Sequence, residues 1–141
     1  LPPPKEIELK TKKNISEIFK EEGESYFRDV EEKICIDLLT KHNCVISLGG
    51  GSIINSKIRK TIKKNSYSIY LQVKISNLLN RLKSSKKRPL LNENQDRGEI
   101  LQKIYNDRQQ FYKKADFIVD NDNDKFQVLR EIKSKLNSYA E

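Results

Sequence analysis

The chain has 141 residues and a formal charge of +8, with 35% hydrophobic and 34% charged residues. This composition is typical of one globular domain, and no apolar run approaches the roughly 18 residues that a bilayer-spanning helix needs. The N-terminus lacks the features of a signal peptide, so we expect a cytoplasmic protein with no membrane partner.

Helices dominate the first part of the chain. Residues 5–12 read as a short helix entered through prolines, which suit a helix start. Asn14 and Glu17 resemble a capping box that opens a second helix ending near Gly23. Apolar residues at spacings of three and four then predict a longer helix over residues 25–40.

A short apolar strand, residues 45–48, runs directly into Gly49, Gly50 and Gly51. Three glycines in a row remove every side chain, so another group can approach the bare backbone closely. Because open α/β sheets bind ligands at the carboxyl ends of their strands, this position predicts a binding site.

The second half alternates helices and strands. The predicted helices cover residues 56–64, 75–82, 100–112 and 126–136, and the predicted strands cover residues 68–72 and 117–119. A long loop, residues 84–98, separates the second of these helices from the third. Strands separated by helices of this length predict right-handed crossovers and a parallel sheet. The last helix carries Phe126, Leu129, Ile132 and Leu136.

Two cysteines, Cys35 and Cys44, are interpreted as reduced, packed thiols, because no third ligand is spaced near them for a metal site. Two basic clusters account for much of the positive charge. We interpret residues 57–64 as a solvated helix surface, whereas residues 81–88 hold two arginines and lead into the long loop. No platform of aromatic and basic residues indicates a nucleic-acid partner.

Three arginines are candidates for binding an anion. Arg28 and Glu31 stand one helical turn apart; the pair is either a surface salt bridge, the better interpretation when it is taken alone, or an arginine fork aimed inward. Arg88 lies in the long loop, where it could cover a transferring phosphate. Arg108 interrupts an apolar helical stripe and therefore needs a buried partner or a ligand.

Four motifs in this order resemble the shikimate kinase family. They are S-E-I-F-K-E-E-G-E-x-x-F-R-x-x-E (16–31), V-I-S-L-G-G-G (45–51), R-P-L-L (88–91) and R-x-x-x-Y-x-x-A-D (108–116). The resemblance implies an α/β fold, a three-layer parallel sheet of the P-loop kinase type with strand order 2-3-1-4-5. It also implies an enzyme of chorismate and aromatic amino acid biosynthesis that transfers the γ-phosphoryl group of ATP, with Mg²⁺, to the 3-hydroxyl of shikimate.

The resemblance assigns the substrate-binding residues. Arg28 and Arg108 match the arginines that bind the shikimate carboxylate, and Glu31 matches the acidic residue that orients the shikimate-binding arginine. The segment Gly49, Gly50 and Gly51 matches glycines that pack against the substrate. Bidentate arginines suit a planar carboxylate.

The resemblance also assigns the nucleotide-binding residues. Arg81 matches the arginine that stacks on adenine, and residues 121–124 match the adenine-side loop. Arg88 matches the lid arginine that reaches over the phosphates, where a mobile cation suits the spreading charge of phosphoryl transfer. No residue is assigned to a metal.

Two family features are absent from these 141 residues. The phosphate-binding loop G-x-x-x-x-G-K-[ST] is missing, and with it the Ser/Thr that holds Mg²⁺. The family's Asp-x-Asp falls on Pro2 and Pro4, whose side chains accept no proton. We therefore expect one domain, residues 1–141, that lacks the first two strands and the first helix of the fold. Residues 1–43 would be its shikimate-binding helices and residues 84–98 its lid.

This expectation has consequences for folding and for activity. The missing first strand lies in the middle of the family's sheet, so residues 45–48 would lose their backbone partners. Another chain would then fill the gap, or the domain would be loosely packed, although family members are monomers. We expect such a chain, from a truncated gene or a partial sequence, to be inactive by itself. The alternative is a non-catalytic protein that binds shikimate or a nucleotide.

Overall fold

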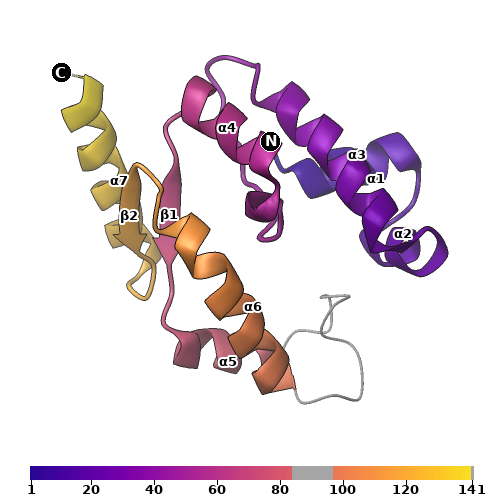
Figure 1. Cartoon of the computed structure of the whole chain (residues 1–141). Helices are drawn as coiled ribbons and strands as arrows, with labels where there is room; N and C mark the ends of the chain where they lie inside the picture. The colour runs from indigo at the N-terminus through magenta and orange to yellow at the C-terminus, as the bar shows by residue number, and fades with distance from the viewer. Residues whose placement is uncertain (84–96, 141) are drawn as a thin grey trace. The chain divides into compact units, whose positions relative to one another are not determined.

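The computed structural model describes residues 1–83 and 97–140 and divides into two compact units, which we describe separately (Figure 1). Of the described residues, the first unit takes 1–66 and the second takes 67–83 and 97–140. The expectation of a single domain over residues 1–141 stays a prediction.

The first unit is built from helices. Its elements are α1 (Pro3–Thr11), α2 (Ile15–Glu21), α3 (Gly23–Leu38), the 3₁₀ turn η1 (Ser52–Ile54) and α4 (Ser56–Asn65). α3 is the central helix, because α1, α2, α4 and η1 all pack against it (Figure 1). The helices predicted for this part of the chain are confirmed, with most of their ends moved by one or two residues.

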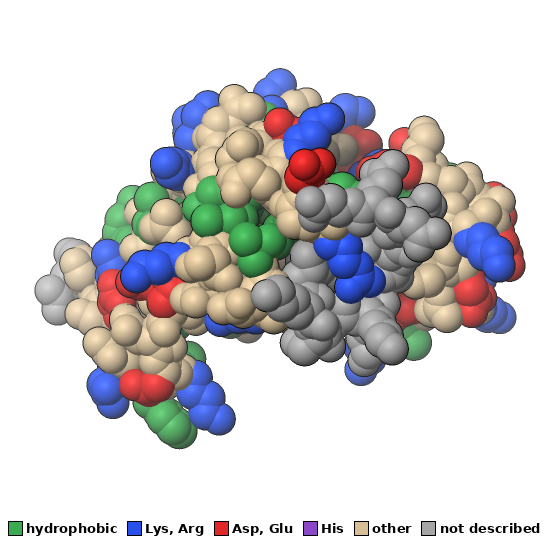
Figure 2. All heavy atoms as spheres, turned by 90° about the horizontal axis from the view of Figure 1, so that it is seen from below, with side chains coloured by type: hydrophobic (Ala, Val, Ile, Leu, Met, Phe, Trp, Pro, Cys, Tyr) green, Lys and Arg blue, Asp and Glu red, His purple; other side chains and the backbone are tan. Residues whose placement is uncertain are grey.

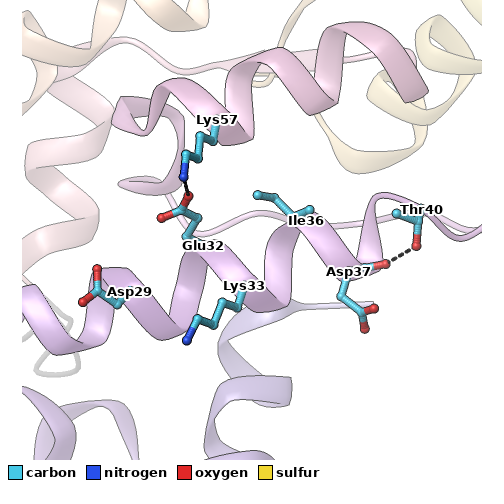
Figure 3. A pocket seen from close by; sticks show the side chains of 7 residues that line it. All are labelled: Asp29, Glu32, Lys33, Ile36, Asp37, Thr40 and Lys57. Atoms are coloured by element: carbon cyan, nitrogen blue, oxygen red, sulfur yellow. Dashed lines mark hydrogen bonds and ion pairs between the residues drawn. The ribbon is translucent and has the colours of Figure 1, made fainter.

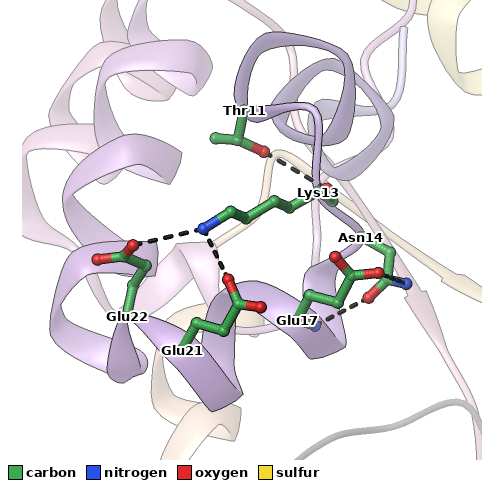
Figure 4. Close-up of polar contacts among 6 residues, drawn as sticks. All are labelled: Thr11, Lys13, Asn14, Glu17, Glu21 and Glu22. Carbon is green, nitrogen blue, oxygen red and sulfur yellow. Dashed lines mark hydrogen bonds and ion pairs between the residues drawn. The ribbon is translucent and has the colours of Figure 1, made fainter.

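The start of α2 is fixed by a side-chain cap. The backbone N–H of Glu17 donates to Asn14 Oδ1 at 2.8 Å (Figure 4). Glu17 Oε1 accepts from the side-chain amide of Asn14 at 2.7 Å, whereas in a capping box the carboxylate accepts from the backbone N–H. Lys13 Nζ lies 2.7 Å from Glu21, and their hydrogen bond raises the pKa of Lys13 and lowers the pKa of Glu21. Both side chains are exposed enough for this ion pair to contribute little to stability.

Two hydrophobic clusters lie on different faces of α3. The cluster toward α1 and α2 consists of Ile7, Ile18, Phe27, Ile34 and Leu38, and the cluster toward α4 consists of Cys35, Leu39, Ile58 and Ile62. Cys35 is fully buried, as predicted, but Cys44 is exposed, so the prediction of two packed thiols is wrong for Cys44. The reason is that Cys44 follows the turn after α3, outside both clusters.

The predicted strand over residues 45–48 is not formed. The segment alternates as a strand would, since Ile46 and Leu48 are half-buried and Val45 is 84% exposed. Within residues 1–83 and 97–140, however, its backbone is paired only with Leu1, which donates to the Val45 carbonyl at 2.6 Å and accepts from the Ser47 N–H at 3.2 Å. A strand requires a partner strand, and the described residues place none beside this segment.

The second unit holds a small parallel sheet. Its elements are β1 (Ile69–Gln72), α5 (Ile75–Lys83), α6 (Arg97–Tyr112), β2 (Phe117–Asp120) and α7 (Lys125–Ala140). Among the described residues the sheet has two strands, with Ile69 opposite Phe117 and Gln72 opposite Asp120. α7 packs on β2 and α5 packs on α6 (Figure 1). The α/β class and the parallel pairing are confirmed.

The ends of the second unit's helices correct two expectations. α6 begins at Arg97, so residues 97–98 belong to a helix and not to the predicted loop; residues 84–96 lie outside the described residues. On α7, Phe126 and Leu129 are 62% and 50% exposed, and Val128 is the buried residue. The spacing of apolar residues thus predicted that α7 is a helix, but it did not predict that Val128 is the residue that α7 buries. Figure 2 shows one face of the molecule, on which hydrophobic side chains lie at the surface beside charged ones.

Candidate functional site

The candidate site of the first unit begins with an ion pair on α3. Arg28 Nη1 donates to Glu31 Oε1 at 2.8 Å, and the Glu31 side chain is only 4% exposed. A second carboxylate, that of Glu24, lies 3.5 Å from Arg28 Nη2 but is 53% exposed. The surface salt bridge is therefore the wrong interpretation for the Arg28–Glu31 pair, because one partner is buried.

Burial makes Glu31 dependent on Arg28. A carboxylate removed from water is costly unless a cation and hydrogen bonds compensate it. The Arg28 side chain remains 29% exposed, so the cation that pairs with this buried anion is not itself fully removed from solvent. The guanidinium carbon also lies 5.2 Å from the centre of the Phe27 ring, a cation–π contact. The helix thus presents an oriented guanidinium that can still accept an anionic ligand.

The glycine segment lies against this pair. A Cβ at Gly49 would lie 3.6 Å from Glu31 Oε2, and a Cβ at Gly51 would lie within 3 Å of the Arg28 guanidinium. Gly50, between them, is exposed. The structure therefore brings together the substrate-side residues predicted in the first unit: Arg28, Glu31, Gly49, Gly50 and Gly51. Pro4 also reaches this place, 3.7 Å from the Cβ position of Gly49.

Residues that sequence reasoning missed hold the glycine segment in place. Ser52 is fully buried, and its hydroxyl accepts from the Cys35 thiol at 3.9 Å. Arg59 Nη1 donates to the carbonyls of Ile53 and Ile54 at 2.9 and 2.6 Å. The interpretation of residues 57–64 as a solvated helix surface is therefore wrong for Arg59. The one signal in the sequence for this contact is that Arg59 falls in the first turn of α4, close to the residues that precede the helix.

Burial also determines the chemistry of the thiol beneath the segment. Desolvation raises the pKa of Cys35 to about 11, and the hydrogen bond with Ser52 offsets part of this rise. At neutral pH the group is therefore a neutral thiol, which is a poor nucleophile. Cys35 packs below the site and supplies no reactive group.

A groove in the first unit is lined by other residues. It has a volume of about 680 Å³ and is lined by Asp29, Glu32, Lys33, Ile36, Asp37, Thr40 and Lys57 (Figure 3). In Figure 3, Lys57 of α4 reaches across to Glu32 of α3, and the two are 3.5 Å apart. None of the predicted site residues lines this groove, and most of its charged side chains are exposed. We assign no binding role to it.

The second unit carries the other predicted arginines. Arg108 is half-buried on α6, and its side chain makes no hydrogen bond or ion pair within residues 1–83 and 97–140. Arg81 is exposed on α5. Arg88 lies outside the described residues. Next to Arg108, Gln109 Nε2 donates to the Tyr70 hydroxyl at 2.7 Å, which fastens α6 to β1.

The segment after β2, residues 121–124, is fastened to the start of α5. The Asp122 carboxylate accepts from the side-chain amide of Asn77 at 2.6 Å and from the Lys74 N–H at 3.2 Å. The hydrogen bond from Asn77 is the main reason that the pKa of Asp122 is lowered. Because Arg81 belongs to the same helix as Asn77, this bond connects the two predicted adenine-side elements.

The described part of the chain contains neither a cluster of metal-binding residues nor a membrane-spanning helix. Over residues 1–83 and 97–140, no three His, Cys, Asp or Glu side chains gather into a group that could hold a metal ion. No helix in the same ranges has the length and apolar character needed to cross a membrane.

Comparison with known proteins identifies the family. The shikimate kinase family profile matches residues 4–137. The chain is 34% identical to a shikimate kinase of Bartonella henselae over 89% of its length, and 37% identical to one of Alteromonas mediterranea over 93%. These alignments span 60% and 77% of the two relatives. The chain therefore has an α/β fold of the P-loop kinase type, and it belongs to the shikimate kinase family.

A solved structure extends this likeness to three dimensions. The shikimate kinase of Acinetobacter baumannii, determined in complex with shikimate, is 26% identical to the chain, with a TM-score of 0.89. The match covers 97% of this chain and 78% of that structure. The described residues thus share the fold of that shikimate kinase.

Proposed function

We propose that this chain supplies the shikimate-binding part of an enzyme that phosphorylates the 3-hydroxyl of shikimate with ATP. The observation that carries the proposal is the Arg28 guanidinium, held by the buried Glu31 carboxylate against the glycine segment. A fixed, partly exposed guanidinium is suited to bind a planar carboxylate, and shikimate carries one. The bound shikimate in the Acinetobacter baumannii relative supports this choice of ligand.

Each substrate-side residue has a role in this proposal. Arg28 binds the carboxylate, and Glu31 fixes the direction of its guanidinium. Arg108 is a second arginine for the same carboxylate, which agrees with its lack of a partner among the described residues. The glycines form the floor of the site, because only backbone separates the ligand from the segment beneath it.

The nucleotide-side roles rest on the resemblance. Arg81 stacks on adenine, residues 121–124 line the adenine side, and Arg88 neutralises charge on the phosphates during transfer. ATP would supply the phosphoryl group. The resemblance gives the Mg²⁺ ligand to the Ser/Thr of the phosphate-binding loop, so we assign none of the described residues to Mg²⁺ and derive no step through it. From the resemblance we also propose a cytoplasmic monomer that acts on shikimate and ATP, with no nucleic-acid or membrane partner.

We propose further that the 141 residues alone bind shikimate but transfer no phosphate. They contain no G-x-x-x-x-G-K-[ST] motif to hold the phosphates, and Pro4 lies beside Gly49 where the resemblance places an aspartate. Without a phosphate cradle or a proton acceptor, the two groups on which phosphoryl transfer most depends are missing.

Calorimetry with shikimate tests the binding site. The chain should bind at millimolar ligand, and Arg28→Ala should weaken binding by roughly 10- to 100-fold, the value of a hydrogen bond to a charged group. Lys33→Ala is the matched control, because Lys33 is an exposed cation on the same helix. Absence of heat with the unaltered chain, or equal binding by Arg28→Ala, would contradict the proposed site.

A coupled assay tests the catalytic half of the proposal. With ATP, Mg²⁺ and shikimate, the 141-residue chain should show no turnover above the blank; clear turnover would contradict the role given to the missing loop. The coding sequence ahead of Leu1 then separates the enzyme from the non-catalytic binding protein. An in-frame glycine-rich phosphate loop there would favour the enzyme.

A further inference from the structure

Gly51 is a glycine for a reason that differs from that of Gly23. Gly23 has φ +86°, a conformation that L side chains rarely adopt, and nothing lies within 4 Å of its Cβ position. Gly51 has φ −85° and ψ −11°, which any residue adopts. Backbone conformation therefore does not require a glycine at position 51. The requirement for a glycine comes instead from the lack of space for a side chain there.

The space is occupied by the arginine of the candidate site. A Cβ at Gly51 would lie 2.5 Å from Arg28 Nη2, 2.6 Å from Nη1 and 2.9 Å from Cζ. All three separations are shorter than real Cβ contacts. At Gly49, by contrast, the nearest atom would be Glu31 Oε2 at 3.6 Å, an ordinary contact. The guanidinium thus lies where a side chain of residue 51 would be.

We propose that Gly51 is a positioning residue, which sets the place of the Arg28 guanidinium by leaving its side-chain volume empty. The inference rests on the proposed function for its consequence, since Arg28 is the arginine that binds the carboxylate. In this view Gly51 acts on the ligand through Arg28. Glu31 holds one edge of the guanidinium, and the bare backbone of Gly51 limits how far the group extends.

The backbone at Gly51 is the less yielding of the two groups. The Ile54 N–H donates to the Gly51 carbonyl at 3.3 Å, and the Ser52 N–H donates to the Gly49 carbonyl at 3.1 Å. Ser52 is fully buried, so the turn is anchored in the core. The guanidinium, in contrast, ends a long side chain with several rotatable bonds. An added methyl group would therefore displace the guanidinium, by about 1 Å to restore an ordinary contact.

A displacement of this size disturbs carboxylate binding. Two parallel N–H···O bonds require the guanidinium and the carboxylate to be coplanar and in register. We expect Gly51→Ala to weaken shikimate binding by roughly 10- to 100-fold, because one charge-assisted hydrogen bond is lost or misaligned. Gly49→Ala, whose methyl group has room beside Glu31, is the matched control for the position of Arg28, and it should leave the guanidinium in place; because Gly49 is itself part of the floor, it is not a control for shikimate binding.

Nitrogen NMR of the ligand-free chain tests the position of Arg28 directly. The Arg28 Nε–Hε signal, assigned by its absence from Arg28→Ala, should shift in Gly51→Ala and stay unchanged in Gly49→Ala. An unmoved signal in Gly51→Ala would overturn the inference. A moved signal in a chain that binds no shikimate would leave the inference standing and count against the proposed function instead.

Calorimetry of a double variant tests whether Gly51 acts through Arg28. In the Arg28→Ala background, Gly51→Ala should cause a much smaller loss of shikimate binding than it causes in the unaltered chain, because only the direct effect of the methyl group on the floor of the site remains; an equal loss in both backgrounds would overturn the inference. If Gly51→Ala alone does not fold, the Arg28→Ala/Gly51→Ala double variant should recover the far-UV circular dichroism of Arg28→Ala, because the clashing group is gone. Failure to recover would show that Gly51 is needed for another reason.

Discussion

Removal of the Arg28 side chain should destabilise the first unit through the carboxylate that it leaves behind. In Arg28→Ala, Glu31 keeps its buried position, at 4% exposure, but loses the partner that lies 2.8 Å away. Breaking a buried ion pair in this way costs about 3–5 kcal/mol. Since Arg28 is itself 29% exposed, we take the lower end, about 3 kcal/mol.

Urea unfolding followed by circular dichroism measures this cost, and two further variants locate its origin. Glu24→Gln changes the other carboxylate near Arg28, but that side chain is 53% exposed, so we expect a loss below about 1 kcal/mol. The double variant Arg28→Ala/Glu31→Gln removes the buried charge together with its partner. It should therefore be more stable than Arg28→Ala alone.

Two results would refute the reasoning. A loss below about 1 kcal/mol in Arg28→Ala would mean that water reaches the Glu31 carboxylate. A double variant no more stable than Arg28→Ala would mean that lost packing, and not an uncompensated charge, explains the effect.

Three further predictions concern other parts of the chain. Gly23→Ala should cost about 1–2 kcal/mol in urea unfolding because residue 23 has φ +86°, and an unchanged midpoint would show that the backbone relaxes. In the folded chain a maleimide should label Cys44, which is exposed, and spare Cys35, whose pKa is raised to about 11; rapid labelling of both would contradict the burial of Cys35. Asp122 has a lowered pKa, so its stabilising effect is present above the unfolded value of about 3.9 and is lost as pH falls through the folded value. In the unaltered chain, the Lys74 amide should accordingly lose protection from hydrogen exchange on acidification. In Asp122→Asn, which has no titrating carboxyl at this position, the loss of protection with falling pH should be much smaller. Equal pH dependence in both would contradict this role.

The helices and strands were predictable where their signals are local. Asn14 and the spacing of apolar residues along residues 25–40 place α2 and α3, because caps and amphipathic faces act within one or two turns of helix. The segment 45–48 carries an equally good local signal, yet it forms no strand. A strand depends on a hydrogen-bonding neighbour, which sequence periodicity alone does not supply.

The candidate site was predictable in its members but not in its arrangement. The order and spacing of the motifs pointed to Arg28, Glu31 and the three glycines. The same i,i+3 spacing also fits an exposed salt bridge, so it did not reveal that Glu31 is buried. Arg59 was interpreted as a solvated cation. Its hydrogen bonds to the turn before α4 could not be predicted, because they depend on how that turn folds back onto the helix.

By itself, the sequence determined the family, the helix-forming segments and the chemical types at the site, since these follow from residue identity and spacing. Only the tertiary structure decided which charges are buried and which glycine is needed for space. Burial and close approach arise when α3 and the glycine segment, some 20 residues apart along the chain, come into contact. Because of this contact, the Arg28 guanidinium occupies the space that a side chain at position 51 would need.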